Sequence, residues 1–186
     1  ARNFCMRAKP RTLEELATIT AIYRPGPLAA KVDKKYVRTK REAENGNPVR
    51  YDHPVIEEIL SETYGFISFQ EQFMLLAQKL AGFDKGESDK MRKTLVKKSL
   101  DSNAAKVQER IDLRKKFVNG AVDLSGMKRD RAESLYEPIE YFSGYGFNKS
   151  HAVSYAIDSY YSAWLHTYYE KEWLATCLQT QNGTNK

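Results

Sequence analysis

The chain has 186 residues, of which 41% are hydrophobic and 12% aromatic, and its formal net charge is +6. This length suits one domain with a single core. No stretch reaches the roughly 20 apolar residues that a membrane span needs, and the N-terminus lacks the pattern of a signal peptide. Cys5 and Cys177 lack partners for a zinc site, so we interpret both as reduced. We therefore expect a globular cytoplasmic protein without membrane contact.

The positive charge is concentrated in the first two thirds of the chain. Residues 130–186 carry seven acidic and four basic side chains, a net charge of −3, which leaves +9 for residues 1–129. Residues 90–116 alone hold ten Lys or Arg side chains against three acidic ones. This density favours contact with a polyanion such as DNA, although a solvated face with no binding role explains it equally well.

The first part of the chain predicts two helices separated by a rigid turn. A helix is expected over residues 12–23, where Thr12 and Glu15 have the spacing of a capping box. The Pro-Gly-Pro turn at residues 25–27 must end this helix, because it removes backbone donors. A second, charge-rich helix is expected over residues 28–44.

The middle of the chain predicts helices with clear starts and stops. Asp52 or His53 can cap a helix that has Pro54 in its first turn. Further helices are expected over residues 86–98 and 103–119, followed by a connector at 120–126. The strongest signal is a helix that ends at Gly82, in which four apolar residues recur on one face: Phe69, Phe73, Leu76 and Leu80.

The last part of the chain predicts a broken helix and a long one. Residues 128–142 favour a helix, which Pro138 is expected to kink or split. A long helix is expected over residues 151–169 and a last one over 170–179. No segment alternates apolar and polar residues, so the predicted fold class is all-α.

The run GYGFNKSHA at residues 144–152 carries the strongest functional signal. Its glycines predict a turn that delivers Asn148, Lys149 and Ser150 to the start of the long helix. Unpaired backbone N–H groups and the positive end of the helix dipole favour an anion there, and a triphosphate would fit. The simpler interpretation is that Asn148 or Ser150 caps the helix and Lys149 is solvated.

Two other segments place cations in defined positions. On the helix predicted over residues 86–98, Lys90, Lys93 and Lys97 share one stripe, which is either solvated or faces phosphates. Arg92 lies toward the apolar side, where a rigid guanidinium can grip a phosphate with two parallel bonds or form a buried ion pair. Arg24 precedes the Pro-Gly-Pro turn, which fixes its direction.

These segments together resemble a known family. YRPGPL at residues 23–28, FQEQFMLLAQ at 69–78 leading into MRKTLVKK at 91–98, and GYGFNKSHA resemble the fingers region of C-family replicative DNA polymerases, which include the bacterial DNA polymerase III alpha subunit. The resemblance extends to FVNGAV and YSAWLHTYY and covers nearly the whole chain. It implies that residues 1–186 form one all-α fingers region of a larger or split polymerase.

The resemblance also implies partners and site residues. The expected partners are template-primer DNA, an incoming dNTP, and the palm and thumb of the polymerase, in the same or a separate chain. The implied nucleotide-binding residues are Arg24, Phe69, Arg92, Lys93, Asn148, Lys149 and Ser150, and the DNA-binding residues are Lys90, Lys97 and Lys98.

Catalysis is expected to depend on another part of the polymerase. In this family three palm aspartates hold two Mg²⁺ ions for attack by the primer 3′-hydroxyl. The chain has no stretch that resembles the palm motifs. We therefore expect that it has no catalytic residue, binds no metal, and extends no primer by itself.

Three departures from the family pattern indicate a divergent relative, for which a phage origin is one interpretation. Phe69 stands where the family usually has Tyr, Lys93 replaces Arg, and Pro138 interrupts a helix that is usually continuous. The alternative function is a helical nucleic-acid-binding or accessory module that keeps the fingers scaffold without the nucleotide site. For the polymerase, we expect Lys149 and either Arg92 or Lys93 to converge on one cleft from adjacent helices.

Overall fold

The computed structural model describes residues 1–96, 104–143 and 147–181, and in these residues the fold is all-α, as predicted. A short 3-10 turn, η1 (Ser61–Thr63), follows α5, and an isolated bridge pairs Phe69 with Phe147. The α-helices, in chain order, are α1 (Arg2–Ala8), α2 (Leu13–Ile22), α3 (Pro25–Ala29), α4 (Val32–Glu44), α5 (Pro54–Leu60), α6 (Gln70–Ala81), α7 (Lys85–Val96), α8 (Ala104–Ser125), α9 (Arg129–Ser143), α10 (Lys149–Tyr168) and α11 (Glu170–Gln181).

Several predicted helix ends are confirmed by their hydrogen bonds. The Thr12 hydroxyl accepts a bond from the Glu15 N–H at 3.2 Å and caps α2. His53 caps α5, because its Nδ1 accepts a bond from the Val55 N–H at 3.1 Å. Gly82 ends α6 in the left-handed conformation, with φ 69°. Each signal acts within four residues, which is why the sequence revealed it.

The first helices differ from the prediction in two ways. Helix α1 was not predicted, and residues 25–27 begin the short helix α3 rather than a plain turn. Helix α4 therefore starts at Val32 and not at Leu28. Lys31 separates the two helices, because its left-handed conformation, φ 57°, cannot continue a right-handed helix.

Two predicted breaks lie inside continuous helices. The expected connector at residues 120–126 was wrong, because α8 runs through Gly120 to Ser125. A Cβ at Gly120 would lie 2.2 Å from the Ala81 carbonyl oxygen, so this glycine permits close packing of α8 on the end of α6. Pro138 does not split α9, which continues to Ser143.

In the part of the chain that the structure describes, three groups of buried side chains hold the helices together. The largest group contains residues from α5, α6, α7, α8 and α9, among them Phe73, Leu76 and Phe117. A second packs α1, α2 and α4 around Tyr36. The third places Ala152 and Ala156 of α10 against Ala17 and Ala21 of α2, together with Phe69. The predicted apolar face of α6 is therefore core, and its Phe73 is fully buried.

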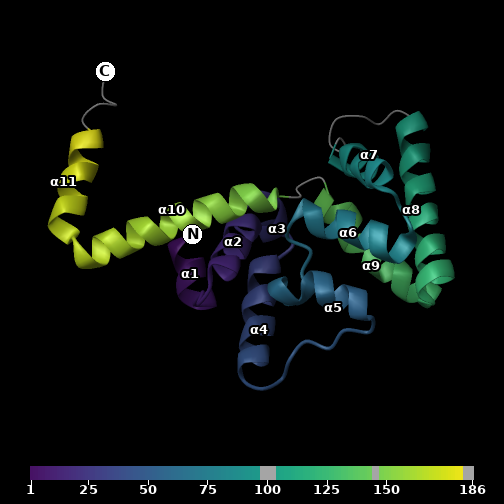
Figure 1. The fold of residues 1–186 in the computed structure, drawn as a ribbon, viewed down its shortest axis with the longest axis horizontal. Helices are drawn as coiled ribbons and strands as arrows, with labels where there is room; N and C mark the ends of the chain where they lie inside the picture. The colour runs from purple at the N-terminus through teal and green to yellow at the C-terminus, as the bar shows by residue number, and fades with distance from the viewer. Residues whose placement is uncertain (97–103, 144–146, 182–186) are drawn as a thin grey trace.

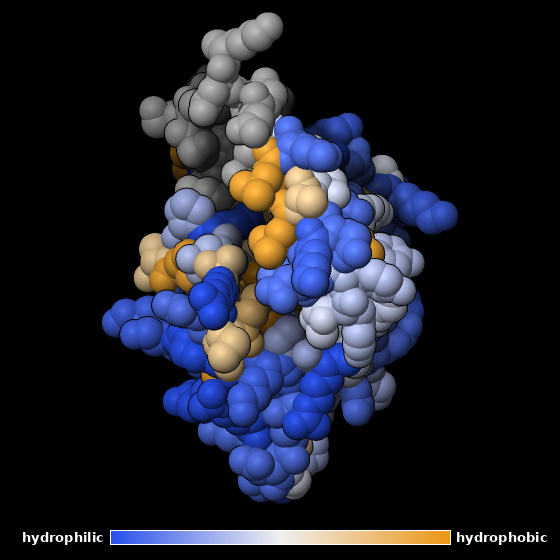
Figure 2. Space-filling view, turned by 90° about the vertical axis from the view of Figure 1, so that its left-hand side faces the viewer, coloured by the Kyte–Doolittle hydropathy of each residue, from blue (hydrophilic) through white to orange (hydrophobic). Residues whose placement is uncertain are grey.

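Helix α10 links the helical body to an extended arm (Figure 1). Its first half crosses α2, and its second half projects away from the body and leads into α11. The side chains of residues 158–180 are exposed apart from Trp173 and Cys177, which are half-buried. Seen from the end of the arm, hydrophobic residues form a stripe in a mainly hydrophilic surface (Figure 2).

Candidate functional site

A carboxylate of the chain itself, that of Glu71, lies at the start of α10. Asn148 caps the helix, because its Oδ1 accepts a bond from the His151 N–H at 2.9 Å. The Glu71 carboxylate of α6 accepts bonds from the Asn148 side-chain amide at 2.8 Å and from the Lys149 N–H at 3.0 Å. A helix N-terminus binds anions through such free N–H groups, and here a carboxylate occupies the position.

Lys149 adds a positive charge beside this helix start. Its ammonium group donates to Glu62 at 2.6 Å and lies 5.9 Å from the centre of the Phe69 ring. The side chain is 39% exposed, so solvent and a ligand can reach it. Ser150 is exposed and does not cap the helix; its carbonyl accepts a bond from the Ser154 hydroxyl at 3.0 Å.

Phe69 and Phe147 join α6 to the segment that precedes α10. The Gln70 N–H donates to the Phe147 carbonyl at 3.0 Å, next to the bridge between the two phenylalanines. The Phe69 side chain is only 2% exposed. Its ring therefore supports Phe147 and Lys149 from the core side. The glycine turn that was predicted at residues 144–146 lies outside the described residues.

Arg24, which lies between α2 and α3, contacts Phe147. Its guanidinium lies 4.7 Å from the centre of the Phe147 ring, and its Nε donates to the Ala21 carbonyl at 2.7 Å. One terminal nitrogen of Arg24 is buried and has no hydrogen-bond partner among the described residues. Burial also lowers the pKa of the guanidinium from its ordinary value. A buried donor without a partner is costly, and an anionic ligand would satisfy it.

The structure therefore brings together four of the residues expected to bind a nucleotide: Arg24, Phe69, Asn148 and Lys149. Glu62 and Glu71, which hold Lys149 and Asn148, were not identified from the sequence. Each is distant from its partner along the chain, and no local pattern marks it.

The cations of α7 pair with acidic residues of α7 itself and of α8. Arg92 donates through Nε at 3.0 Å and through a terminal nitrogen at 2.8 Å to Asp89, and Lys93 pairs with Asp89 at 2.7 Å. These bonds, first from Lys93 and then from Arg92, lower the pKa of Asp89. Lys90 is exposed and lies 3.5 Å from Glu109 of α8. Lys97 and Lys98 lie outside the described residues.

Helix α7 packs against α6, α8 and α9, whereas α10 packs against α2 and α11. Arg92 and Lys93 share Asp89, while Lys149 pairs with Glu62. Within the described residues, helices α7 and α10 are therefore not a packed pair, contrary to the expectation that they lie side by side. The convergence of the two groups on one cleft remains a prediction.

Within the described part of the chain, no group of three or more His, Cys, Asp or Glu side chains is placed to hold a metal ion. The expectation that Mg²⁺ binds only with a palm remains a prediction. None of the helices in the described ranges combines the length and the apolar character that crossing a bilayer requires.

Comparison with known proteins identifies the family. Residues 1–124 match the family described as the bacterial DNA polymerase III alpha subunit finger domain. The chain is 38% identical over 185 residues to a DNA polymerase III subunit alpha of Aquifex aeolicus, covering 100% of this chain and 15% of that protein. It is 41% identical over 175 residues to the one of Treponema pallidum, covering 94% of this chain and 14% of that protein. The chain thus spans about 15% of the length of these relatives, and it belongs to the bacterial DNA polymerase III alpha subunit finger-domain family.

Proposed function

We propose that this chain is the fingers region of a replicative DNA polymerase and that the start of α10 binds the triphosphate of an incoming dNTP. The observation that carries the proposal is the pair of cations beside the bridged residues Phe69 and Phe147, with Arg24 near the Phe147 ring and Lys149 near the Phe69 ring. Arg24 has a buried nitrogen without a hydrogen-bond partner among the described residues, and Lys149 stands at a helix N-terminus. Fixed cations and helix N-termini are suited to the charge of a triphosphate.

Two carboxylates would have to exchange with the triphosphate. Glu71 accepts bonds from the α10 N-terminus, and Glu62 pairs with the Lys149 ammonium. Both ends of the Lys149–Glu62 pair are partly exposed, and such pairs contribute only about 0–1 kcal/mol. In this proposal Glu62 and Glu71 keep the donors ordered before the nucleotide arrives, and a polyphosphate with more negative charge replaces them.

The first experiment measures nucleotide incorporation by the complete polymerase that contains this chain. Lys149→Ala and Arg24→Ala should each reduce kcat/KM for single-nucleotide incorporation by the equivalent of about 1.5–3 kcal/mol, because each removes a charge-assisted bond. DNA affinity should change little. Lys79→Ala is the matched control, since Lys79 is exposed on α6 and pairs with Glu58. Normal incorporation by both variants would show that the triphosphate site is wrong.

The second experiment concerns DNA. We propose that Lys90, with Lys97 and Lys98, contacts phosphates of the template-primer. Lys90→Ala should weaken DNA binding and lower the slope of log K against log salt by about 1, because one fewer counterion is released. Nucleotide use should be spared. An unchanged salt slope would contradict this role and would favour a solvated face.

A non-catalytic nucleic-acid-binding module remains the competing function. The two functions differ in whether a palm with three aspartates accompanies this chain in the same or an adjacent reading frame. The similarity to complete alpha subunits supports the polymerase.

A further inference from the structure

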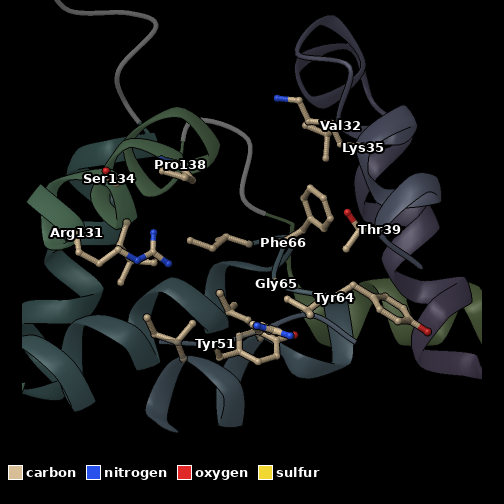
Figure 3. Close-up of a pocket in the computed structure, with 16 residues that line it drawn as sticks. Val32, Lys35, Thr39, Tyr51, Tyr64, Gly65, Phe66, Arg131, Ser134 and Pro138 are labelled. Carbon is tan, nitrogen blue, oxygen red and sulfur yellow. The ribbon is translucent and has the colours of Figure 1, made fainter. Parts of the chain in front are cut away.

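A cavity of about 440 Å³ lies between α4 and α9 (Figure 3). The loop before α5, helix α5 itself and the turn at residues 64–67 complete its walls. None of its lining residues belongs to the site around Arg24 and Lys149. Its volume falls within the range of small-ligand sites, about 300–1,000 Å³.

The inside of this cavity is apolar and carries two aromatic rings. Ile56, Leu60 and Ile67 are buried and form part of its wall. Phe66 and Tyr51 are only half-buried, and in Figure 3 Phe66 stands between the α9 residues and Thr39 of α4. Partly exposed rings on an apolar wall suit a flat aromatic ligand, which can stack on them.

The rim of the cavity is positively charged. Lys35 and Arg50 are exposed, and neither has an ion-pair partner among the described residues. Arg131 is instead neutralised by Asp52, whose pKa is lowered chiefly by the hydrogen bond from Arg131. The described lining contains no Asp or Glu side chain. Two cations thus remain available for an anion at the mouth, and the nearby Asp52 carboxylate is paired with Arg131.

A strained turn holds Phe66 in this position. Tyr64 and Gly65 are consecutive left-handed residues, with φ values of 54° and 85°. The first two residues of the turn are tied down, because the Tyr64 hydroxyl donates to Glu15 at 2.6 Å and the Gly65 N–H donates to the Leu60 carbonyl at 2.9 Å. A left-handed residue other than glycine costs about 1 kcal/mol or more, and such strain concentrates at ligand sites.

We propose that this cavity binds one nucleotide, with its base against Phe66 and Tyr51 and its phosphate on Lys35 and Arg50. Aromatic stacking combined with a cationic rim is the chemistry by which proteins hold unpaired nucleotides without reading their sequence. A free nucleotide and an unpaired nucleotide of a single strand offer the same base and phosphate. The site is independent of the proposed triphosphate site, with which it shares no residue.

Photocrosslinking tests the location and the source of the nucleotide. Two probes are used with the full chain and with the complete polymerase: 5-iodo-dUTP, and a single-stranded DNA 12-mer carrying one 5-iododeoxyuridine. Mass spectrometry should find crosslinks at Phe66 or Tyr51. Crosslinks with the 12-mer identify the ligand as an unpaired strand, and crosslinks with 5-iodo-dUTP identify a free nucleotide. Absence of crosslinks to this cavity with both probes would overturn the proposal.

Affinity measurements separate stacking from charge. Phe66→Leu keeps the apolar wall but removes the ring, and it should weaken binding of the successful probe by about fivefold or more. For a strand, an abasic 12-mer should lose no affinity from this change. Lys35→Gln should weaken the binding of both the 12-mer with its base and the abasic 12-mer. Lys34→Gln, on the same helix but outside the cavity, is the matched control.

A second variant guards against loss of folding. Thr39→Trp replaces one lining residue by a larger one, which fills the space beside Phe66, and its thermal unfolding can be compared with that of the unchanged chain. A folded Thr39→Trp chain should lose the crosslinks at Phe66 and Tyr51. Undiminished crosslinking there would overturn the proposal.

Discussion

Lys40 shows how a buried charge ties three parts of the chain together. Its side chain has no exposed surface, and its ammonium group lies 3.2 Å from Glu15 and 2.5 Å from Glu44. Glu15 also accepts bonds from the Tyr64 hydroxyl and the Arg11 N–H, both at 2.6 Å. The network joins α2 and α4 to the turn that presents Phe66. Two carboxylates share the Lys40 ammonium group, and Arg11 lies 3.6 Å from one of them, Glu44.

Removal of the Lys40 charge should therefore strongly destabilise the protein. Lys40→Ala leaves Glu15 buried without its cation, and we expect the free energy of unfolding to fall by about 3–5 kcal/mol. Urea unfolding followed by circular dichroism measures this. Arg38→Ala is the control, because the Arg38–Glu42 pair on the same helix is largely exposed and should contribute less than about 1 kcal/mol. Equal unfolding midpoints for the two variants would contradict the role of Lys40.

The packing of helix α8 depends on one position without a side chain. Gly120 allows the backbone of α8 to approach Ala81, and a Cβ there would meet three backbone atoms of Ala81 within 2.9 Å. Helix propensity and packing thus oppose each other. Alanine favours an isolated helix by about 1 kcal/mol over glycine, but here backbone atoms occupy the space that its methyl group needs.

We expect packing to dominate. Gly120→Ala should destabilise the protein by about 1–3 kcal/mol, as overpacking of a core typically does. Gly86→Ala in α7 is the comparison, because the nearest atom to its Cβ is a movable Asp84 carboxylate oxygen at 3.3 Å. That change should be neutral or slightly stabilising in the same unfolding experiment. If Gly120→Ala were as stable as Gly86→Ala, close approach of α8 and α6 would not require glycine.

The molecule consists of a packed body and an arm that contributes little to it. The first half of α10 is held by contacts of Ala152 and Ala156 with α2, whereas exposed rings and leucines line the rest of α10 and α11. Inside the arm, the Trp173 indole donates to the Ser162 hydroxyl at 3.2 Å. The body and the arm should therefore differ in their effect on stability.

Truncation tests this division. A chain that ends after Asp158 should keep its free energy of unfolding within about 1 kcal/mol, because few buried apolar contacts are lost. Ala156→Asp should be strongly destabilising by comparison, since it places a charge in the contact between α10 and α2, where Ala156 is fully buried. Differential scanning calorimetry of both proteins measures the effect. A large loss of stability on truncation would mean that the arm is part of the cooperative unit.

Short-range signals were sufficient for the all-α class, for the cap at Thr12 and for the core face of α6. They narrowed two further caps to pairs of residues, Asp52 or His53 and Asn148 or Ser150, between which the structure decided. Each of these depends on hydrogen bonds or side-chain spacing within a few residues, which a sequence displays directly. The motif around Asn148 and Lys149 likewise marked a helix start that attracts anions.

Long-range packing decided the remainder. The partners of Lys149 are 87 and 78 residues away along the chain, at Glu62 and Glu71, and nothing near them in the sequence identifies them. Gly120 is a residue type that is common in connectors, yet it lies inside α8 because the backbone of Ala81 packs against it. The wall of the cavity between α4 and α9 is likewise assembled from distant segments, because Tyr64, one of its lining residues, donates a hydrogen bond to Glu15, which lies 49 residues away along the chain. Such features depend on which helices meet, and that is determined by burial of the whole chain rather than by local conformational preference.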